Sequence, residues 1–316
     1  MSRQISESQT VPEDMSGMRV DQIASKLFSE YSRVRLQGWI KSGELTIDGK
    51  TLKPKEKLWG GELLEIEAEL EDVNQWQAEN IPLEIVYEDD DILVINKPVG
   101  LVVHPAAGHY NGTLLNALLY HYPGIEVVPR AGIVHRLDMD TSGLMVVAKT
   151  IEAQTDLVDQ LQTREMGREY EAVVQGVMTG GGVVDEPIGR HPVSRMKQAV
   201  IASGKPAITH YRVMDRYQNH THIRLKLETG RTHQIRVHMS HLGYPLIGDA
   251  VYAGRMRIPK GASPALLNML QSFKRQALHA KRLELVHPIT GEDMAWEVEL
   301  PQDMVELLAC LAEEDN

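Results

Sequence analysis

Three segments of the chain carry reactive side chains in places where a packed core would not need them. The first, residues 132–144, holds Arg136, Asp138 and Asp140 on a loop of small and hydroxyl residues that leads into an apolar run. A carboxylate beside an arginine could act as a nucleophile or as a general base. Asp138 or Asp140 could equally cap a turn, so residue type and spacing leave both interpretations open.

The second segment, residues 168–174, offers an aromatic side chain. Tyr170 and Ala172 share one face of an expected strand, while Glu169 and Glu171 share the other. A tyrosine in a strand is more often a core or edge residue than a catalytic one. The pattern alone therefore favours a packing role for this tyrosine.

The third segment, residues 228–243, combines arginines with histidines. Arg231 and Arg236 are five positions apart, so on a helix they would point in different directions, and one could serve a carboxylate and the other a phosphate. His238 and His241 have a spacing that a metal could use. No carboxylate completes such a site, so we expect solvated or capping histidines and predict no metal.

A scaffold of strands and helices must position these segments. Apolar runs predict strands, and Thr150 precedes a helical pattern as an N-cap would. The expected strands are residues 85–87, 92–95, 144–148, 170–175 and 223–227, and the expected helices are residues 114–122 and 151–164. Strands and helices mix without regular alternation, which predicts an α+β fold with a mainly antiparallel sheet.

The pattern divides the chain into four parts. These are a flexible tail (residues 1–17), a small module (18–75), the end of an acidic linker (76–82) and a larger block (83–316). The small module has helical spacing from Val20 to Leu27, and Ser32 is the expected N-cap of a second helix that ends at Gly43. A small hairpin unit with the turn Asp48-Gly49 follows.

Charge is distributed unevenly along the chain. The formal net charge is −11, yet residues 19–59 hold nine Lys or Arg against five acidic residues. Residues 60–91 hold twelve acidic residues and no Lys or Arg. The whole-chain value therefore hides a basic module of the kind that binds phosphates.

Composition excludes several classes of protein. Hydrophobic residues make up 42% of the chain, enough for a sizeable core. The single cysteine, Cys310, excludes an internal disulfide and a zinc site of several thiolates, and it fits a reducing compartment. The first 18 residues lack the apolar centre of a signal peptide, and no apolar run approaches the ~20 residues of a membrane helix. We therefore expect a soluble, cytoplasmic protein without a membrane partner.

The three segments, in this order, resemble the motifs of the RluA-type pseudouridine synthases. The matching stretches are residues 135–144, 168–170 and 230–238. The basic module resembles an S4 RNA-binding domain, on the stretches 32–35 and 47–50. The resemblance covers about residues 19–310. It implies an S4-like domain followed by a larger synthase domain, in which a mainly antiparallel mixed sheet is flanked by helices and loops around a central cleft.

The resemblance also implies roles for single residues. Asp138 matches the essential aspartate that acts at the ribose, Tyr170 the tyrosine that packs on uracil and helps to remove the C5 proton, and Arg236 the basic partner of the aspartate. Arg136 matches the arginine that inserts where the flipped base leaves the stack. Further implied substrate contacts or supports are His135, Arg231, His233 and Gln234. The implied RNA-binding residues of the S4-like module are Ser32, Arg33, Arg35, Lys41, Lys50 and Lys53.

The implied activity is the isomerisation of uridine to pseudouridine in large-subunit (23S) ribosomal RNA. Closer matches at residues 87–89, 101–105, 129–135 and 301–307 imply targets in the hairpin loop that bridges the two ribosomal subunits. The substrate is the free RNA or the assembling large subunit, the protein is expected to be a monomer, and no cofactor or metal is implied. Asp138 could attack C1′ or remove the 2′ proton to give a glycal.

Two other functions remain open at this point. A non-catalytic RNA-binding or ribosome-assembly factor could keep the same fold, although the intact Asp138, Tyr170 and Arg236 weigh against it. A glycoside- or nucleoside-cleaving enzyme could use Asp138 and Asp140 as a carboxylate pair, but it would have no use for an S4-like module. Release of tritium from C5-labelled uridine distinguishes all three.

Overall fold

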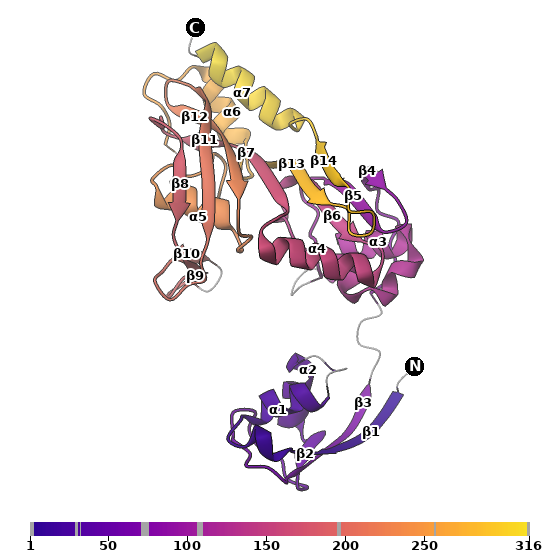
Figure 1. Cartoon of the computed structure of the whole chain (residues 1–316). Coiled ribbons are helices and arrows are strands. Elements are labelled where there is room, and N and C mark those ends of the chain that lie inside the picture. The colour runs from indigo at the N-terminus through magenta and orange to yellow at the C-terminus, as the bar shows by residue number, and fades with distance from the viewer. Residues whose placement is uncertain are drawn as a thin grey trace. The chain divides into compact units, whose positions relative to one another are not determined.

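The chain forms two units, which the computed structural model divides between Gln75 and Trp76 (Figure 1). The structure describes residues 3–28, 31, 33–70, 76–105, 110–194, 197–255 and 257–314. Each unit buries apolar side chains in a core of its own.

In the first unit, two helices pack on a three-stranded antiparallel sheet. Ile23, Leu36 and Ile40 on the helices and Leu64 and Ile66 on the sheet are buried together, because helical and strand spacing turn them to one side. The elements are β1 (Arg3–Thr10), a 3₁₀ turn (Glu13–Met15), α1 (Val20–Leu27), α2 (Arg33–Ser42), β2 (Leu45–Ile47) and β3 (Leu63–Leu70), with the sheet order β1-β3-β2.

The prediction of a flexible tail at residues 1–17 is wrong for the part that the structure describes, which begins at residue 3. β1 pairs with β3 along its whole length, from Arg3 opposite Leu70 to Thr10 opposite Leu63. Ile5 is buried in the core of this unit, whereas most of its neighbours in the strand are polar and exposed. The strand is held mainly by main-chain hydrogen bonds and by the buried Ile5, so its other side chains can be polar. Its composition therefore resembles that of a flexible tail.

The second unit is built on a nine-stranded sheet. β6 and β13 run parallel, and the other neighbouring strands among the described residues run antiparallel, which confirms the predicted α+β fold. In spatial order the strands are β4 (Glu84–Glu88), β5 (Ile92–Lys97), β6 (Ser142–Ala148), β13 (Leu278–Val286), β7 (Gly167–Gln175), β12 (His220–Leu227), β11 (Ile208–Arg216) and β8 (Gly182–Asp185), with β14 (Asp293–Glu297) beside β13. β9 (Ile188–Arg190) and β10 (Gln198–Val200) form a separate hairpin.

Helices cover both faces of this sheet (Figure 1). Alternate residues of β5 enter different cores: Ile92 and Val94 pack with α4, while Leu93 and Ile95 pack with α3. Thr150 caps α4 as predicted, because its hydroxyl accepts a hydrogen bond from Ala153 N at 3.1 Å. The helices are α3 (Leu114–His121), α4 (Ile151–Thr163), α5 (Gln234–His241), α6 (Pro264–Ser272) and α7 (Gln302–Glu314), with 3₁₀ turns at Pro123–Val127 and Pro129–Gly132.

The stretch 76–82 is part of the second unit, which corrects its prediction as the end of a linker. Trp76 and Ile81 pack against the core of that unit. Asn116 Nδ2 also donates a hydrogen bond to Gln77 O at 2.8 Å. Two large apolar side chains outweigh the otherwise mostly polar composition of the stretch. Across the described residues, no helix combines the length and the apolar character needed to cross a membrane.

Candidate active site

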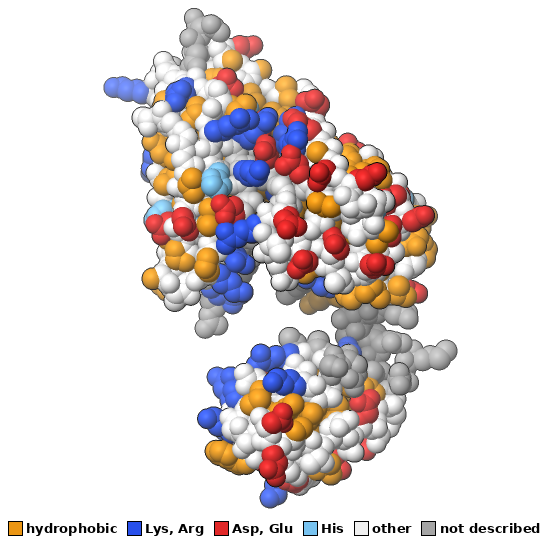
Figure 2. Space-filling view, in the orientation of Figure 1, with side chains coloured by type: hydrophobic (Ala, Val, Ile, Leu, Met, Phe, Trp, Pro, Cys, Tyr) orange, Lys and Arg blue, Asp and Glu red, His pale blue; other side chains and the backbone are white. Residues whose placement is uncertain are grey.

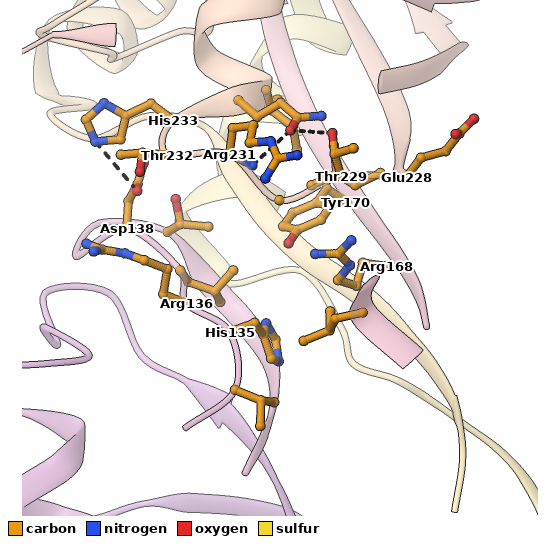
Figure 3. Close-up of a pocket in the computed structure, with 18 of the residues that line it drawn as sticks. His135, Arg136, Asp138, Arg168, Tyr170, Glu228, Thr229, Arg231, Thr232 and His233 are labelled. Carbon is orange, nitrogen blue, oxygen red and sulfur yellow. Dashed lines mark hydrogen bonds and ion pairs between the residues drawn. The ribbon is translucent and has the colours of Figure 1, made fainter. Parts of the chain in front are cut away.

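The three reactive segments meet at one cleft of about 540 Å³ in the second unit (Figure 3). Asp138 lies on the loop before β6, Tyr170 on β7 and Arg236 in the first turn of α5. Side chains from three distant parts of the sequence therefore line the same space. Such convergence of charged and aromatic groups in a concave site is typical of an active site.

Backbone contacts fix the loop that carries Asp138. Thr141 N donates a hydrogen bond to Asp138 O at 3.0 Å, which makes a tight turn. The parallel pairing of β6 with β13 then leads the chain away beside Ala280. At Gly143 φ is +115°, and a Cβ there would lie 2.3 Å from Ala280 O, so the close approach of these strands needs glycine.

A buried lysine also holds the loop that carries Asp138, through hydrogen bonds to backbone carbonyls. Lys97, at the end of β5, is fully buried, and its Nζ donates hydrogen bonds to Pro98 O, Leu101 O and Met139 O at 2.7–3.0 Å. Burial lowers the pKa of Lys97 to about 8, although the nearby charges of Asp140 and Asp138 oppose this. Its ammonium group is therefore committed to holding the backbone next to Asp138.

Arg236 joins two carboxylates. Its Nη1 donates to Asp138 Oδ2 at 2.8 Å, while its Nε and Nη2 donate to the two oxygens of Asp249 at 2.7 and 2.9 Å. Burial opposes the charge of this guanidinium, but the hydrogen bonds and charge of Asp249, followed by those of Asp138, outweigh it and raise the pKa of Arg236. The arginine is thus permanently charged and aimed at Asp138.

Asp249, which orients Arg236, is a residue of the site that the sequence analysis did not identify. It is 2% exposed, and its Oδ1 also accepts hydrogen bonds from Val251 N and Tyr252 N at 2.9 and 3.0 Å. Burial acts to raise its pKa, but the contacts with Arg236 and these amides lower the pKa of Asp249. It lies in a loop with no motif of its own, and only its place in the fold pairs it with Arg236.

His233 lies on the other side of Asp138. Its Nε2 is 3.7 Å from Asp138 Oδ1 (Figure 3). Its Nδ1 is hydrogen-bonded to Tyr252 Oη at 2.7 Å. Burial lowers the pKa of His233, and the charge of Asp138 only partly offsets this. The ring is therefore mostly neutral at pH 7, which leaves Arg236 as the cation paired with Asp138.

Tyr170 is buried in the main core of the second unit and also lines the cleft. Burial raises the pKa of its phenol, the charge of Arg168 opposes this rise, and the charge of Asp138 adds to it. The phenol is therefore neutral at rest, with its ring available as a flat wall of the cleft. The expected packing role and the implied contact with a base are compatible in this position.

The other implied substrate contacts fall into two groups. Arg136 is exposed at the cleft, and Arg231 is half-buried, with its Nε donating to Pro206 O at 3.0 Å. His135 is inward-facing: its Nε2 accepts from Val146 N at 3.1 Å, and burial, with the charge of Arg168, lowers its pKa to about 3.

Gln234 has a supporting position. Its amide oxygen accepts from Thr229 Oγ1 and Arg231 N at 2.8 and 2.9 Å. Its amide nitrogen donates to Ile208 O and Thr209 Oγ1, both at 3.0 Å. Since these four bonds occupy the amide, the residue shapes the loop before α5 and has little left to offer a ligand.

The implied RNA-binding residues of the first unit differ in their surroundings. Lys41, Lys50 and Lys53 are exposed, and Figure 2 shows Lys and Arg side chains gathered along one side of this unit. Arg33 Nη2 instead contacts the buried Asp21 at 2.8 Å. Arg35 is half-buried, and Ser32 lies outside the described residues.

The histidines of the third segment do not converge. His238 is fully buried, where its ring is hydrogen-bonded to Thr209 Oγ1 and Glu186 O, both at 2.9 Å, and His241 is exposed. The expectation of a solvated or capping ring is therefore wrong for His238. Among the described residues, Asp89, Asp91 and His287 come close enough to hold a cation.

That acidic group is better explained as a turn. Asp89 Oδ1 accepts from Asp91 N and Ile92 N, while its Oδ2 accepts from Tyr87 Oη and contacts His287 Nε2 at 2.9 Å. His287 Nδ1 accepts from two backbone amides, so its Nε2 carries the proton and donates to Asp89. The absence of a bound metal stays a prediction.

Comparison with known proteins gives the class of this fold and site. The RNA pseudouridylate synthase family matches residues 91–241, a range that includes Asp138, Tyr170 and Arg236. Among solved structures, human RNA pseudouridylate synthase domain containing 4 is similar, with a TM-score of 0.57 and 27% identity, over 72% of this chain and 93% of that one. Human RNA pseudouridylate synthase domain containing 1 has a TM-score of 0.56, 26% identity and coverage of 74% and 89%.

Relatives of nearly full length show the same. The chain is 61% identical over 314 residues to ribosomal large subunit pseudouridine synthase D of Pseudomonas aeruginosa, covering 99% of this chain and 98% of that one. It is 59% identical to the protein of the same name from Yersinia pestis, covering 98% and 96%. The chain therefore belongs to the RNA pseudouridine synthase family and, within it, resembles the enzymes called synthase D.

Proposed function

We propose that the protein isomerises uridines of large-subunit ribosomal RNA to pseudouridine, with Asp138 as the group that acts on the ribose. The observation that carries the proposal is the pairing of Asp138 with the buried Arg236 in a cleft that Tyr170 also lines. The relatives are named ribosomal large subunit pseudouridine synthases, and this name supports the substrate. The reaction breaks the C1′–N1 bond and forms a C1′–C5 bond, without gain or loss of atoms.

Asp138 must be ionised for either route to this product, attack on C1′ or removal of the 2′ proton. The guanidinium of Arg236, 2.8 Å away, is hydrogen-bonded to the Asp138 carboxylate and fixes its direction. Asp249 orients the guanidinium in turn through two hydrogen bonds. The three residues therefore act as one unit that holds the Asp138 carboxylate in a fixed direction.

The target base must leave its stack to reach this cleft. Arg136 is exposed at the cleft, where its planar cation could fill the vacated space and contact phosphate. Tyr170 offers a face for the uracil, and base–aromatic stacking is worth about 1–3 kcal/mol. The exposed Lys41, Lys50 and Lys53 would add phosphate contacts from the first unit, which we take to be an S4-like RNA-binding domain.

The sequence resemblance further leads us to propose that the targets lie in the hairpin loop bridging the two ribosomal subunits, and that a monomer acts in the cytoplasm on the RNA or the assembling subunit. A hydrolase with a pair of carboxylates is less well supported. Asp138 lines the cleft, whereas Asp140 is not among the residues that line it in the described structure.

Tritium release tests the proposal. Large-subunit RNA made with C5-tritiated uridine should release one tritium per modified site with the wild-type protein and none with Asp138→Asn, which should still bind RNA. Mapping of the modified positions would then test the hairpin loop. Binding without tritium release would instead indicate an assembly factor, and free uracil would indicate a hydrolase.

A further inference from the structure

Arg168 is a buried cation of the cleft with no counter-ion among the described residues. It is the second residue of β7, it is 6% exposed, and its Nε is buried without a hydrogen-bond partner. Arg236, in the same cleft, is held by two carboxylates. Taking a guanidinium out of water without an acceptor is unfavourable for folding, so such a group calls for a functional explanation.

The residues around Arg168 direct its guanidinium into the part of the cleft where the flipped uracil would lie. Arg168 and Tyr170 are two positions apart on β7, so they share the face that lines the cleft, and Figure 3 shows them side by side. A Cβ at Gly230 would lie 2.7 Å from Arg168 Nη1. The absence of a side chain at Gly230 therefore makes the room that this guanidinium occupies.

We propose that Arg168 is a catalytic residue that stabilises the uracil anion released during the reaction. The inference rests on the proposed function. When the C1′–N1 bond breaks, its electron pair stays on the uracil ring, while C1′ either bonds to an Asp138 oxygen or becomes part of a glycal as Asp138 takes the 2′ proton. The ring then attacks C1′ through C5. On the first route the Asp138 oxygen leaves C1′ as this bond forms, and on the glycal route Asp138 returns its proton to C2′. The C5 proton then passes to water as N1 gains a proton.

A cation beside the ring stabilises the state in which the uracil is detached. The negative charge of that state spreads over the ring nitrogens and carbonyl oxygens, and the N–H groups of Arg168 can donate to those oxygens. Such a preorganised charge acts more strongly in a water-poor site than in water. His135, next to it, contributes no charge, because burial and Arg168 lower its pKa to about 3.

A phosphate is the less suitable partner for Arg168. The phosphates of a bound RNA stay near the protein surface, where Arg136 is exposed and Arg231 half-buried. The flipped base is the part of the nucleotide that enters the protein deepest. Because Arg168 is 6% exposed, its position matches the base.

Replacement by methionine, together with a change in the leaving base, tests this role. Arg168→Met should lower the single-turnover rate on a uridine substrate about 10²–10³-fold, the usual cost of removing one donor to a developing anion. RNA affinity should change by less than about threefold. When the target is 5-fluorouridine, whose ring anion is more stable, the loss should shrink to about tenfold or less, measured as consumption of the nucleoside in nuclease digests.

Controls separate this role from a structural one. Arg282→Met makes the same change on the neighbouring strand β13, at an arginine paired with Glu284, and should leave both rates unchanged. Arg168→Lys keeps the cation and should recover part of the rate. Arg168→Met should melt no lower than the wild type, because it removes an unpaired buried charge.

Each contrary result has a distinct meaning. Equal losses on uridine and 5-fluorouridine, a lower melting temperature, or a loss confined to RNA affinity would overturn the role of Arg168 while leaving the enzyme a pseudouridine synthase. If the wild-type protein made no pseudouridine from ribosomal RNA, the proposed function would fall, and the role of Arg168 would fall with it.

Discussion

The two units of the molecule use positive charge in opposite ways. In the first unit, Lys41, Lys50 and Lys53 extend into solvent. In the second unit, Arg236 is buried against Asp138 and Asp249. Exposed lysines attract phosphates over a distance and tolerate variation in geometry, whereas a buried, bidentate arginine fixes the direction of one carboxylate. Under the proposed function, attraction of RNA and chemistry on one nucleotide would thus take place in different physical environments.

The comparison predicts the largest loss for Arg236. Arg236→Met should lower pseudouridine formation by at least about 10³-fold and destabilise the second unit by about 3–5 kcal/mol, because two carboxylates lose their shared partner. Single-turnover rates and thermal unfolding measure the two effects. Arg236→Lys should rescue little, since one ammonium cannot serve both carboxylates with the same geometry. A rate for Arg236→Met within tenfold of wild type would contradict this account.

Asp249 should give a smaller loss, because it acts through Arg236. Asp249→Asn keeps the shape but removes the charge, and we expect a rate about 10–100-fold lower with unchanged RNA affinity. The measurement is the single-turnover rate across a pH series, alongside filter binding. If Asp249→Asn weakened RNA binding and left the bound rate intact, Asp249 would have to contact RNA instead of orienting Arg236.

A buried ion pair away from the cleft should affect stability alone. His222 Nε2 contacts Glu171 Oε2 at 3.0 Å. Burial acts to lower the pKa of His222, but the hydrogen bonds to Glu171 and Asp215 outweigh burial, so the pKa of His222 is raised. Its contribution is therefore complete below pH 6.5, the ordinary histidine value, and is lost as pH rises through the raised value.

The His222→Gln variant measures that contribution. It should be less stable than wild type by about 2 kcal/mol between pH 4.5 and 6.5, where Glu171 is ionised and His222 is protonated, and the difference should narrow as the pH is raised further. Urea unfolding of both proteins over this range checks the sign. A difference that grew with pH would show that His222 is neutral in the folded protein.

The smallest effect should come from the exposed lysines. Lys50→Gln combined with Lys53→Gln should weaken RNA binding several-fold and reduce the slope of log affinity against log salt by about 1.5–2, without changing the rate for bound RNA. Lys50→Arg with Lys53→Arg keeps both charges and should bind as wild type does. A change in the rate for bound RNA would mean that the first unit takes part in positioning the target.

Local patterns were sufficient to predict much of the scaffold. The apolar run Leu144–Ala148 forms most of β6, and Thr150 caps α4, because burial and capping act over a few residues. β1 was missed since most of its side chains are polar and β3, some sixty residues away, supplies its hydrogen bonds. The packing of Trp76 could have been anticipated from its size, despite the polar residues on either side of it.

The candidate site was predictable only where a motif exists. Asp138, Tyr170 and Arg236 were singled out by motifs, and the structure brings all three to one cleft. Asp249 lies in no recognisable motif. Its role depends on Arg236, which only the fold brings into contact with it. Arg168 Nε likewise lacks a hydrogen-bond partner among the described residues only because of how the fold surrounds it, and this cannot be read from the sequence.

The most direct test compares two neighbouring carboxylates of one loop. Asp138→Asn and Asp140→Asn are incubated with the same ribosomal RNA fragment at saturating protein, and pseudouridine is counted by mass spectrometry of the digested RNA. The account predicts that Asp138→Asn binds the fragment and forms no pseudouridine, while Asp140→Asn keeps most of the wild-type rate. Pseudouridine formed by Asp138→Asn at a rate close to that of wild type would contradict it.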